Sequence, residues 1–249
     1  MTAVLVIGGT DSSGGAGLAQ DCRVLADMGV PARMIVTAVT AQGVNGVQAV
    51  LTVPPEMLLA QLDAAASLGP ITAIKIGLVP THAAATLLAE RIDQLWPGVQ
   101  LILDPVVMAS AGGALRDAPA GPDGFGSLWA RATLITPNLP EIAALLNVPE
   151  APNRRAMLAQ AEALNRTGAQ AVLLKGGHLP GEAVADCLVT TAGVRWFRAA
   201  RLPGTRRGTG CALASGIGAG LAQGLSLEAA ILKARRWLRA SWGEAGECY

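Results

Sequence analysis

A cysteine lies at the start of a glycine-rich helical segment, in the sequence Gly-Thr-Gly-Cys at residues 208–211. The exposed amides of a helix N-terminus bind anions, and glycines allow an anion to approach the backbone closely. A helix N-terminus also favours a thiolate, so we expect the pKa of Cys211 to be lowered. The alternative is that Cys211 is simply a small residue that packs closely. Arg206 and Arg207 come directly before the segment and add positive charge. The segment therefore predicts an anion site.

Two charged side chains stand where apolar runs end. Asp104 follows the apolar residues 101–103, and a carboxylate at the end of a buried strand is suited to hold Mg²⁺ or its waters. Lys175 ends the apolar run 171–174, from which its ammonium group could reach a phosphate. We expect both side chains to lie at the carboxyl edge of a sheet, where open α/β proteins bind their ligands.

Asn138 and Glu141 lie three residues apart, with Pro140 between them. This spacing predicts a capping box, in which each side chain accepts a backbone N–H of the other at the start of a helix. The functional alternative is a polar pair beside a metal or a phosphate. The spacing alone does not choose between the two.

A second glycine-rich loop, residues 9–17, follows an apolar strand and opens a helix. It is not a Walker A loop, because Gly15 stands where that motif requires lysine. It is not a dinucleotide fingerprint either, because Gln20 stands where glycine or alanine is expected. The loop could expose backbone amides to a ligand, or it could be a flexible turn.

The elements that position these residues alternate between short apolar strands and longer amphipathic helices. This alternation predicts βαβ units and a mainly parallel sheet that helices cover on both faces. Strands are expected at residues 4–7, 34–39, 47–53, 71–77, 101–106, 134–136 and 171–175, with a hairpin at 186–190 and 194–198. Helices are expected at residues 18–28, 54–68, 81–91, 140–147 and 153–167, followed by two more near the C-terminus.

Length and composition narrow the class of protein further. A chain of 249 residues with 51% hydrophobic residues fits one α/β domain, residues 1–249. The net charge of +1 gives no reason to expect a nucleic-acid or membrane-surface partner. The uncharged residues 208–227 include six glycines and several polar side chains, so a buried helix fits better than a membrane span. The scattered cysteines form no zinc motif and, without a signal peptide, predict a cytoplasmic protein.

Seven segments, taken together and in order, resemble the hydroxymethylpyrimidine/phosphomethylpyrimidine kinases of thiamine biosynthesis, a branch of the ribokinase-like superfamily. The segments are GGTDSSGGAGLAQD (8–21), TAVTAQGVNGVQAV (37–50), KIGLVP (75–80), LDPVVM (103–108), LITPNLPEIAALL (134–146), LLKGGH (173–178) and GTGCALASG (208–216). The resemblance implies a three-layer α/β/α domain, a homodimer, and phosphorylation of a small pyrimidine by ATP with Mg²⁺.

The resemblance also implies roles for individual residues. The pyrimidine pocket would be lined by Gly9, Asp21, Gln42 and Val106. Cys211 would be the general base, beside an anion hole formed by Gly208, Thr209 and Gly210. Asn138 and Glu141 would order Mg²⁺ through water, beside the metal ligand expected at Asp104. Lys175 and Thr209 are our candidates for contacts to the ATP phosphates, and Asn138 belongs to the same cofactor site.

The chain departs from the family pattern at three places. Members usually have Thr-His where this chain has Arg206 and Arg207, and we expect these arginines to compensate the charge of a phosphorylated substrate. Residues 110–113, in a glycine-rich tract expected to be a lid or a loose loop, lack the common Lys-Ser-Gly-Asp. Leu78 replaces a common methionine. Two alternatives therefore stay open: a pyridoxal or pyridoxine kinase, and a catalytically silent pyrimidine-binding protein.

Overall fold

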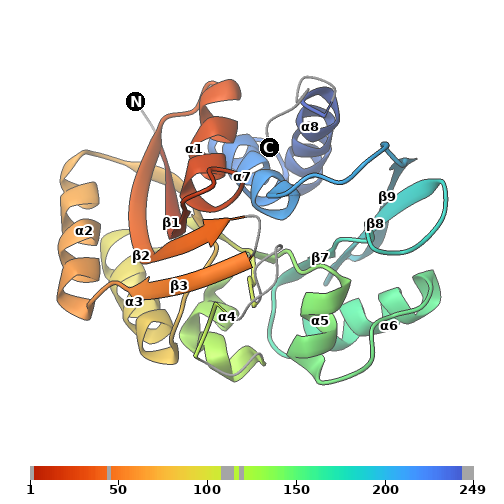
Figure 1. The fold of residues 1–249 in the computed structure, drawn as a ribbon, viewed down its shortest axis with the longest axis horizontal. Helices are drawn as coiled ribbons and strands as arrows, with labels where there is room; N and C mark the ends of the chain where they lie inside the picture. Colours follow the sequence, from red (N-terminus) through yellow and green to blue (C-terminus); the bar gives the residue numbers. More distant parts are fainter. Residues whose placement is uncertain (1–2, 44–45, 108–114, 118–120, 243–249) are drawn as a thin grey trace.

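The computed structural model describes residues 3–43, 46–107, 115–117 and 121–242 of the chain. Within these residues one nine-stranded sheet has the order β3-β2-β1-β4-β5-β6-β7-β8-β9 (Figure 1). The strands are β1 (Ala3–Asp11), β2 (Ala32–Gly43), β3 (Gly46–Thr52), β4 (Ile71–Ile76), β5 (Gln100–Leu103), β6 (Leu134–Ile135), β7 (Ala171–Leu174), β8 (Ala183–Thr190) and β9 (Gly193–Ala200). Six neighbouring strands run parallel, in the sheet order β2, β1, β4, β5, β6 and β7. The strands at the two ends of the sheet pair antiparallel: β3 with β2, β8 with β7, and β9 with β8.

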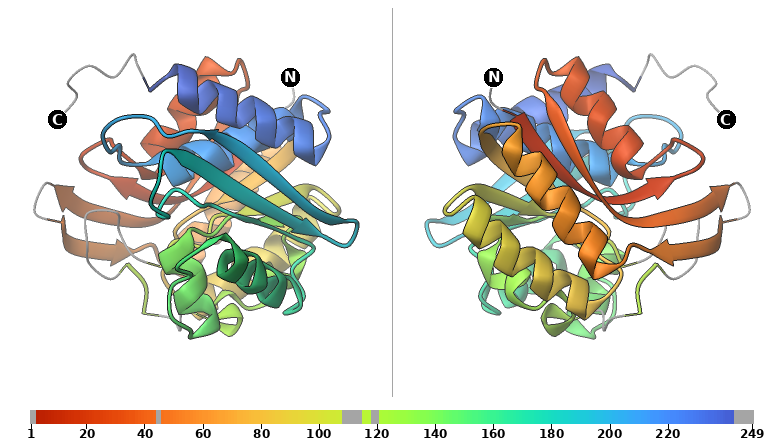
Figure 2. Two further views of the ribbon diagram at one scale, coloured as in Figure 1. Left: turned by 90° about the vertical axis from the view of Figure 1, so that its right-hand side faces the viewer. Right: turned by 90° about the vertical axis from the view of Figure 1, so that its left-hand side faces the viewer.

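Helices cover both faces of the sheet, which confirms the predicted three-layer α/β/α fold (Figures 1 and 2). One layer consists of α1 (Gly17–Asp27), α7 (Thr209–Ala222) and α8 (Leu227–Ala240). The other consists of α2 (Pro55–Ser67), α3 (His82–Leu95), α4 (Ser127–Arg131), α5 (Leu139–Leu146) and α6 (Arg154–Asn165). β1 shows why both layers are needed, because its side chains alternate: Leu5 and Ile7 pack with the second layer, and Val4 and Val6 with the first.

The strand order places a topological switch point between β1 and β4. After β1 the chain forms β2, which pairs with one side of β1, and it later forms β4, which pairs with the other side of β1. The carboxyl ends of β1 and β4 diverge at such a point, and the loops that leave them open a crevice for a ligand. The fold therefore brings the loop after β1 and the residues after β4 to the same edge, as the sequence predicted.

The predicted elements are confirmed, and the differences lie at their ends. β2 continues to Gly43 and pairs with β3 in a projecting arm, so Gln42 lies in a strand, beyond residue 39 where the strand was expected to end. The register of this pair shifts between Ala41 and Gln42. Short-range patterns missed this extension because the pairing with β3, and not the local sequence, holds these residues extended.

The region after β5 contains two short helices that the sequence analysis did not predict. A 3₁₀-helix, η1 (Pro122–Phe125), is followed directly by α4. Phe125 and Trp129 are buried and their rings lie 5.9 Å apart, so tertiary packing holds a segment that is rich in glycine. In the glycine-rich tract 109–126 that was expected to be a lid or a loose loop, residues 109–114 and 118–120 lie outside the described residues, and these include 110–113.

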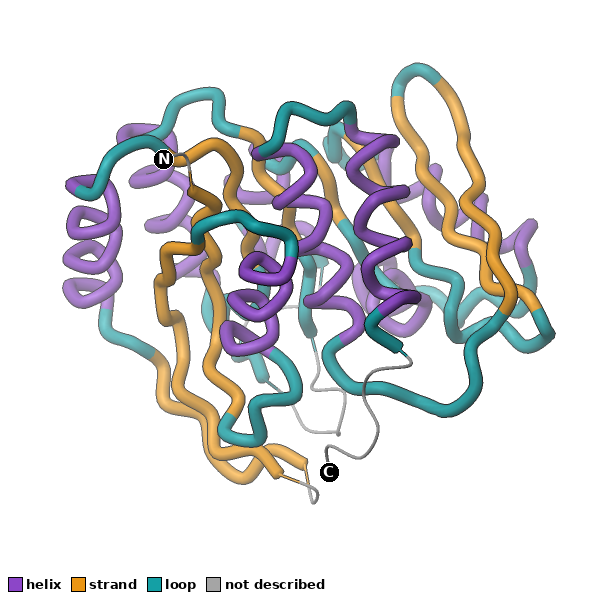
Figure 3. Tube along the Cα trace, turned by 90° about the horizontal axis from the view of Figure 1, so that it is seen from above, coloured by secondary structure: helices purple, strands orange, loops and turns teal. Residues whose placement is uncertain are grey.

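The uncharged segment that begins at residue 208 forms α7, which packs against the sheet and against α8. Figure 3 looks down on the side of the molecule where this helix layer lies. Ten consecutive residues of α7, 212–221, are buried. Its glycines bring the two helices close together, because a Cβ added at Gly220 would lie 2.8 Å from Cβ of Ala230. The same construction at Gly218 meets only ordinary contacts, the nearest being Val4 Cγ1 at 3.6 Å. Among the described residues, every helix is too short or too polar to span a bilayer.

These contacts predict opposite effects of the same substitution two residues apart. Gly220→Ala should destabilise the protein by about 1–3 kcal/mol, because the methyl group overpacks the contact with Ala230. Gly218→Ala should be neutral or stabilising by up to about 1 kcal/mol, because alanine is the better helix former and the added methyl group meets only ordinary van der Waals contacts. Urea-induced unfolding measures both. Equal destabilisation by the two variants would contradict the packing argument.

Candidate active site

A cavity of about 940 Å³ opens at the carboxyl ends of the parallel strands. Loops after β1, β4, β5, β6 and β7 contribute to its walls, together with the N-termini of α5 and α7. All of the sequence-predicted site residues line this one cavity: Gly9, Asp21, Gln42, Asp104, Val106, Asn138, Glu141, Lys175, Gly208, Thr209, Gly210 and Cys211. Residues that are up to 202 positions apart in sequence thus share one site, although their individual roles stay predictions.

Lys175 lies between two carboxylates at the centre of the cavity. Its Nζ is 2.9 Å from Asp104 Oδ1 and 3.8 Å from Glu141 Oε2. Burial raises the pKa of Glu141 to about 7, helped by the charge of Asp104 and opposed by that of Lys175. Burial would also raise the pKa of Asp104, but Lys175 and Lys75 outweigh it, so that pKa is lowered. The cluster therefore holds one firmly ionised carboxylate and one that titrates near neutral pH.

The predicted capping box is confirmed at the start of α5. Asn138 Oδ1 accepts from the backbone N–H of Glu141 at 2.8 Å, and Glu141 Oε2 accepts from that of Asn138 at 2.7 Å. Glu141 also lines the cavity beside Asp104 and Lys175. The two interpretations of this pair are thus compatible, because the cap fixes the carboxylate that faces the site.

The two carboxylates provide donors that fit a divalent cation. Thr136 and Lys175 donate to Oδ1 of Asp104, and the backbone N–H of Asn138 donates to Oε2 of Glu141. Among the described residues no group donates to the other carboxylate oxygen of Asp104 or of Glu141. Mg²⁺ prefers such oxygens, and a bound cation would favour the ionised form of Glu141, whose pKa is raised mainly by burial and to a lesser degree by the charge of Asp104. No group of three or more His, Cys, Asp or Glu in the described part of the chain could hold a metal alone. The remaining ligands would therefore be waters or substrate phosphates.

Asp21 lines the cavity but is already satisfied by protein partners. Both of its carboxylate oxygens lie 2.8 Å from Nζ of Lys75, and Ser215 donates to one of them at 2.7 Å. Burial alone would lower the pKa of Lys75, but the charge of Asp21 outweighs it and raises that pKa, so the ammonium group stays charged. A substrate contact of Asp21 would have to be shared with this ion pair.

Sequence reasoning missed Lys75 and Ser215. The signal for Lys75 was a single charge inside the apolar strand β4, where a lysine is buried only with a partner. Ser215 gave no signal, because serine is common in small-residue helices such as α7.

The expectation of a lowered pKa for Cys211 is wrong. Burial raises the pKa of this thiol to about 11, and the charges of Asp21 and Asp104 add to the rise. Lys75 and a hydrogen bond from the backbone of Gly17 oppose it without reversing it. The position of Cys211 at the N-terminus of α7 favours the thiolate, but the loss of solvent around the sulfur raises the pKa by more than the helix end lowers it. Cys211 is therefore a neutral thiol at pH 7 in the free protein.

The two glycine-rich loops pack directly against each other. Gly208 has a φ of 72°, and a Cβ there would lie 2.1 Å from the carbonyl oxygen of Gly15. Gly17 has a φ of 61°, and its Cβ would lie 2.4 Å from the carbonyl oxygen of Gly9. Only glycine fits both the backbone conformation and the space at these positions. The contact brings the N-termini of α1 and α7 together at the cavity.

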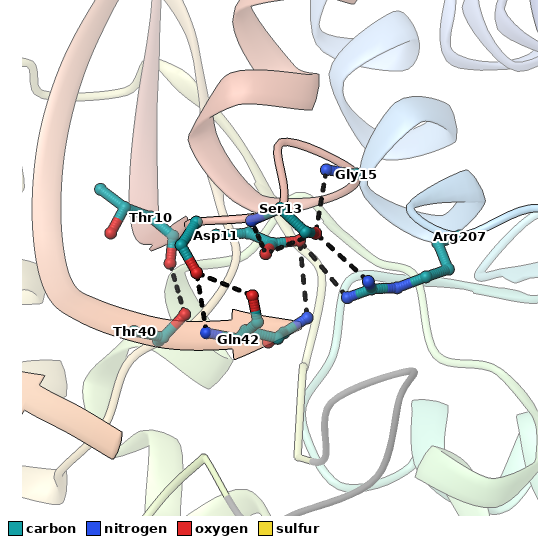
Figure 4. Close-up of polar contacts among 8 residues, drawn as sticks. Thr10, Asp11, Ser13, Gly15, Thr40, Gln42 and Arg207 are labelled. Carbon is teal, nitrogen blue, oxygen red and sulfur yellow. Dashed lines mark hydrogen bonds and ion pairs between the residues drawn. The ribbon is translucent and has the colours of Figure 1, made fainter. Parts of the chain in front are cut away.

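The two arginines that precede α7 are held differently. Arg206 Nη1 donates to the carbonyl oxygen of Ser241 at 2.7 Å, beyond the end of α8. Arg207 reaches across to the loop after β1, with Nη2 3.4 Å from Asp11 Oδ2 and Nη1 3.2 Å from Ser13 Oγ (Figure 4). Both residues line the cavity, but neither is a free cation in this structure.

The cavity extends from these loops into a further part that sequence reasoning did not identify. Its walls are the segment after β9 and the C-terminal end of α8, and they include Ala199, Leu202, Leu238 and Trp242. Asp186 connects this part to Lys175, because it accepts from the backbone of Gly176 at 2.9 Å and pairs with Arg235. The cavity thus reaches from the end of β1 to the C-terminal end of α8, and Lys175 is among its lining residues.

Comparison with known proteins gives one consistent result. A family model described as phosphomethylpyrimidine kinase matches residues 11–247. The hydroxymethylpyrimidine/phosphomethylpyrimidine kinases of Rhizobium meliloti and Escherichia coli are 38% and 36% identical to the chain, over 97% of it and 91% of each relative. A phosphomethylpyrimidine kinase from Clostridium difficile has a TM-score of 0.81 at 29% identity, covering 97% of this chain and 99% of that one.

Pyridoxal kinases share the fold at lower sequence identity. The enzyme from Staphylococcus aureus, solved in complex with AMP-PCP and pyridoxal, has a TM-score of 0.85 at 25% identity, covering 96% of this chain and 87% of that one. The sequence relatives and the family model nevertheless agree on the pyrimidine branch. This chain belongs to the phosphomethylpyrimidine kinase family.

Proposed function

We propose that this protein transfers the γ-phosphoryl group of ATP to 4-amino-5-hydroxymethyl-2-methylpyrimidine, to its monophosphate, or to both in succession. The observation that carries the proposal is the convergence of all the sequence-predicted residues on one cavity. The names of the sequence relatives, and the AMP-PCP bound to a pyridoxal kinase of the same fold, support the substrate class and the use of ATP.

In this proposal each substrate would occupy a different part of the cavity. The pyrimidine would lie against Gly9, Gln42 and Val106, near the end of β1. The nucleotide would occupy the part lined by Leu238 and Trp242, with its phosphates directed toward Lys175 and the amides of residues 208–211. The substrate oxygen would form a bond to the γ-phosphorus as the bond to the bridging oxygen of ADP breaks. Most of the catalysis would come from positioning and charge compensation.

Asp104 and Glu141 are the residues that would hold Mg²⁺, which when bound neutralises charge on the transferring phosphates. The chain contributes the geometry: Thr136 and Lys175 hold one carboxylate, and the cap of α5 holds the other. Lys175 would contact the same phosphates, because its ammonium group lies between the two carboxylates.

We also propose the homodimer that the family resemblance implies. The projecting arm of β2 and β3 supports it, because Val39 and Leu51 are paired in register there and are 48% and 68% exposed. An edge strand with exposed apolar side chains is suited to pairing with a second copy. Sedimentation equilibrium tests the stoichiometry.

An ADP-release assay tests the proposed function. Three acceptors are supplied separately with ATP and Mg²⁺: the hydroxymethylpyrimidine, its monophosphate and pyridoxal. Turnover of either pyrimidine with little turnover of pyridoxal is the expected result. Preference for pyridoxal would support a pyridoxal kinase, and binding without turnover would support a silent binding protein.

The raised pKa of Cys211 predicts a pH dependence that separates the two phosphorylations. Below a pKa of about 11 the thiolate fraction grows about tenfold per pH unit, so kcat/KM for the hydroxymethyl substrate should rise accordingly from pH 7 to 9. The monophosphate attacks with an oxygen that is already ionised, so its kcat/KM should rise much less. Cys211→Ala should abolish the rise and slow the first substrate by about 10²–10⁴-fold. The same slope in the variant would exclude Cys211 as the base.

Substitution of Asp104 tests the metal assignment. Asp104→Asn keeps an acceptor for Thr136 but removes the charge, so kcat should fall by about 10²-fold or more while pyrimidine affinity stays nearly unchanged. Steady-state kinetics over a range of Mg²⁺ concentrations and calorimetric binding of the pyrimidine measure the two effects. A collapse of pyrimidine affinity, or melting several degrees lower, would instead show that Asp104 has a structural role.

A further inference from the structure

Asp11, at the end of β1, connects three segments that are distant in sequence. Its side chain is nearly buried, and Oδ1 accepts from the backbone N–H and the hydroxyl of Ser13 at 2.9 and 2.8 Å. Oδ2 faces Gln42 Nε2 at 3.5 Å and Arg207 Nη2 at 3.4 Å (Figure 4). Nothing in the proposed chemistry uses this carboxylate directly, yet it touches a residue of the pyrimidine pocket.

The contact with Asp11 fixes which way the Gln42 amide faces. A carboxylate only accepts hydrogen bonds, so the amide nitrogen of Gln42, and not its oxygen, must face Asp11. The backbone of Gln42 is held as well, because its N–H donates to Ser12 Oγ at 2.8 Å and its carbonyl accepts from that hydroxyl at 2.7 Å. No described residue donates to Gln42 Oε1, so this oxygen is left for a ligand in the cavity.

We propose that Asp11 is a positioning residue that makes Gln42 select an aminopyrimidine over an oxopyrimidine; this inference rests on the proposed function. The oriented amide offers an acceptor, Oε1, beside its second N–H donor. An aminopyrimidine presents the complementary pair, an amine donor beside a ring-nitrogen acceptor. A 4-oxopyrimidine presents a carbonyl acceptor beside an N–H donor, so like groups would face each other and lose their hydrogen bonds.

Arg207 provides the counter-charge of Asp11 in this arrangement. Its guanidinium group contacts Asp11 and Ser13, both in the loop after β1. Arg207 does not contact Gln42. Removal of Arg207 therefore breaks its ion pair with Asp11 but leaves the Asp11 carboxylate, which accepts from the Gln42 amide and orients it. Arg207→Gln is therefore the matched control for a substitution of Asp11.

The test measures calorimetric Kd values for 4-amino-5-hydroxymethyl-2-methylpyrimidine and for its 4-oxo counterpart. Asp11→Asn keeps an oxygen for Ser13 but presents an amide N–H to Gln42, which allows the Gln42 amide to turn over. The preference for the amino compound, taken as the ratio of the two Kd values, should fall by about tenfold or more, the effect of one hydrogen bond. Arg207→Gln should keep the wild-type ratio. In a Gln42→Met background, Asp11→Asn should not change the ratio further, because the effect acts through Gln42.

Each outcome decides the inference. An unchanged ratio in Asp11→Asn, or an equal fall in Arg207→Gln, would overturn it and leave Asp11 as a support of the loop. A fall in the Gln42→Met background would also overturn it, because the effect would not pass through Gln42. If the wild type binds the pyrimidines but does not phosphorylate them, only the proposed function fails. If it binds neither, both fail.

Discussion

The ion pair between Lys75 and Asp21 is the interaction on which the arrangement of the site depends. Both side chains are almost completely buried, and the pair joins β4 to α1, with Ser215 adding α7. Loss of one member of a buried pair leaves an unpaired charge and typically costs ~3–5 kcal/mol. The pair therefore keeps α1 and α7 in place against the sheet, and with them the helix N-termini that face the cavity.

Small residues make this arrangement possible. Gly208 and Gly17 let the two glycine-rich loops meet backbone to backbone, and Gly220 lets α8 approach α7. A side chain at any of these positions would separate elements that carry site residues. At these three positions glycine therefore permits a close approach of elements around the site.

The same burial determines the charge states in the cavity. Lys175 stays charged because two carboxylates surround it, and Asp104 stays ionised because two lysines lie near it. Nearby lysines favour the ionised forms of Glu141 and Cys211 less strongly than burial disfavours them, so the pKa of both groups is raised. The free protein thus holds a charged centre flanked by two acids that lose their protons less readily. Such a site is prepared for the anionic phosphates of a nucleotide.

The sequence by itself determined the parts of this protein that depend on local pattern. The alternation of apolar strands and amphipathic helices specified the three-layer fold, and the spacing of Asn138, Pro140 and Glu141 specified a helix cap. The expectation that residues after strand ends share one cavity also held, because parallel strands carry their carboxyl ends to one edge.

Tertiary structure alone decided the partners and the charges. Asp11 and Arg207 are 196 residues apart, and Lys75 and Asp21 are 54 apart, so no local pattern pairs them. The shift in the pKa of Cys211 was predicted in the wrong direction. The sequence shows that this residue lies at a helix end, but it does not show how much solvent the folded chain removes from the thiol. Desolvation depends on every segment that packs around a group, and only the folded chain brings those segments together.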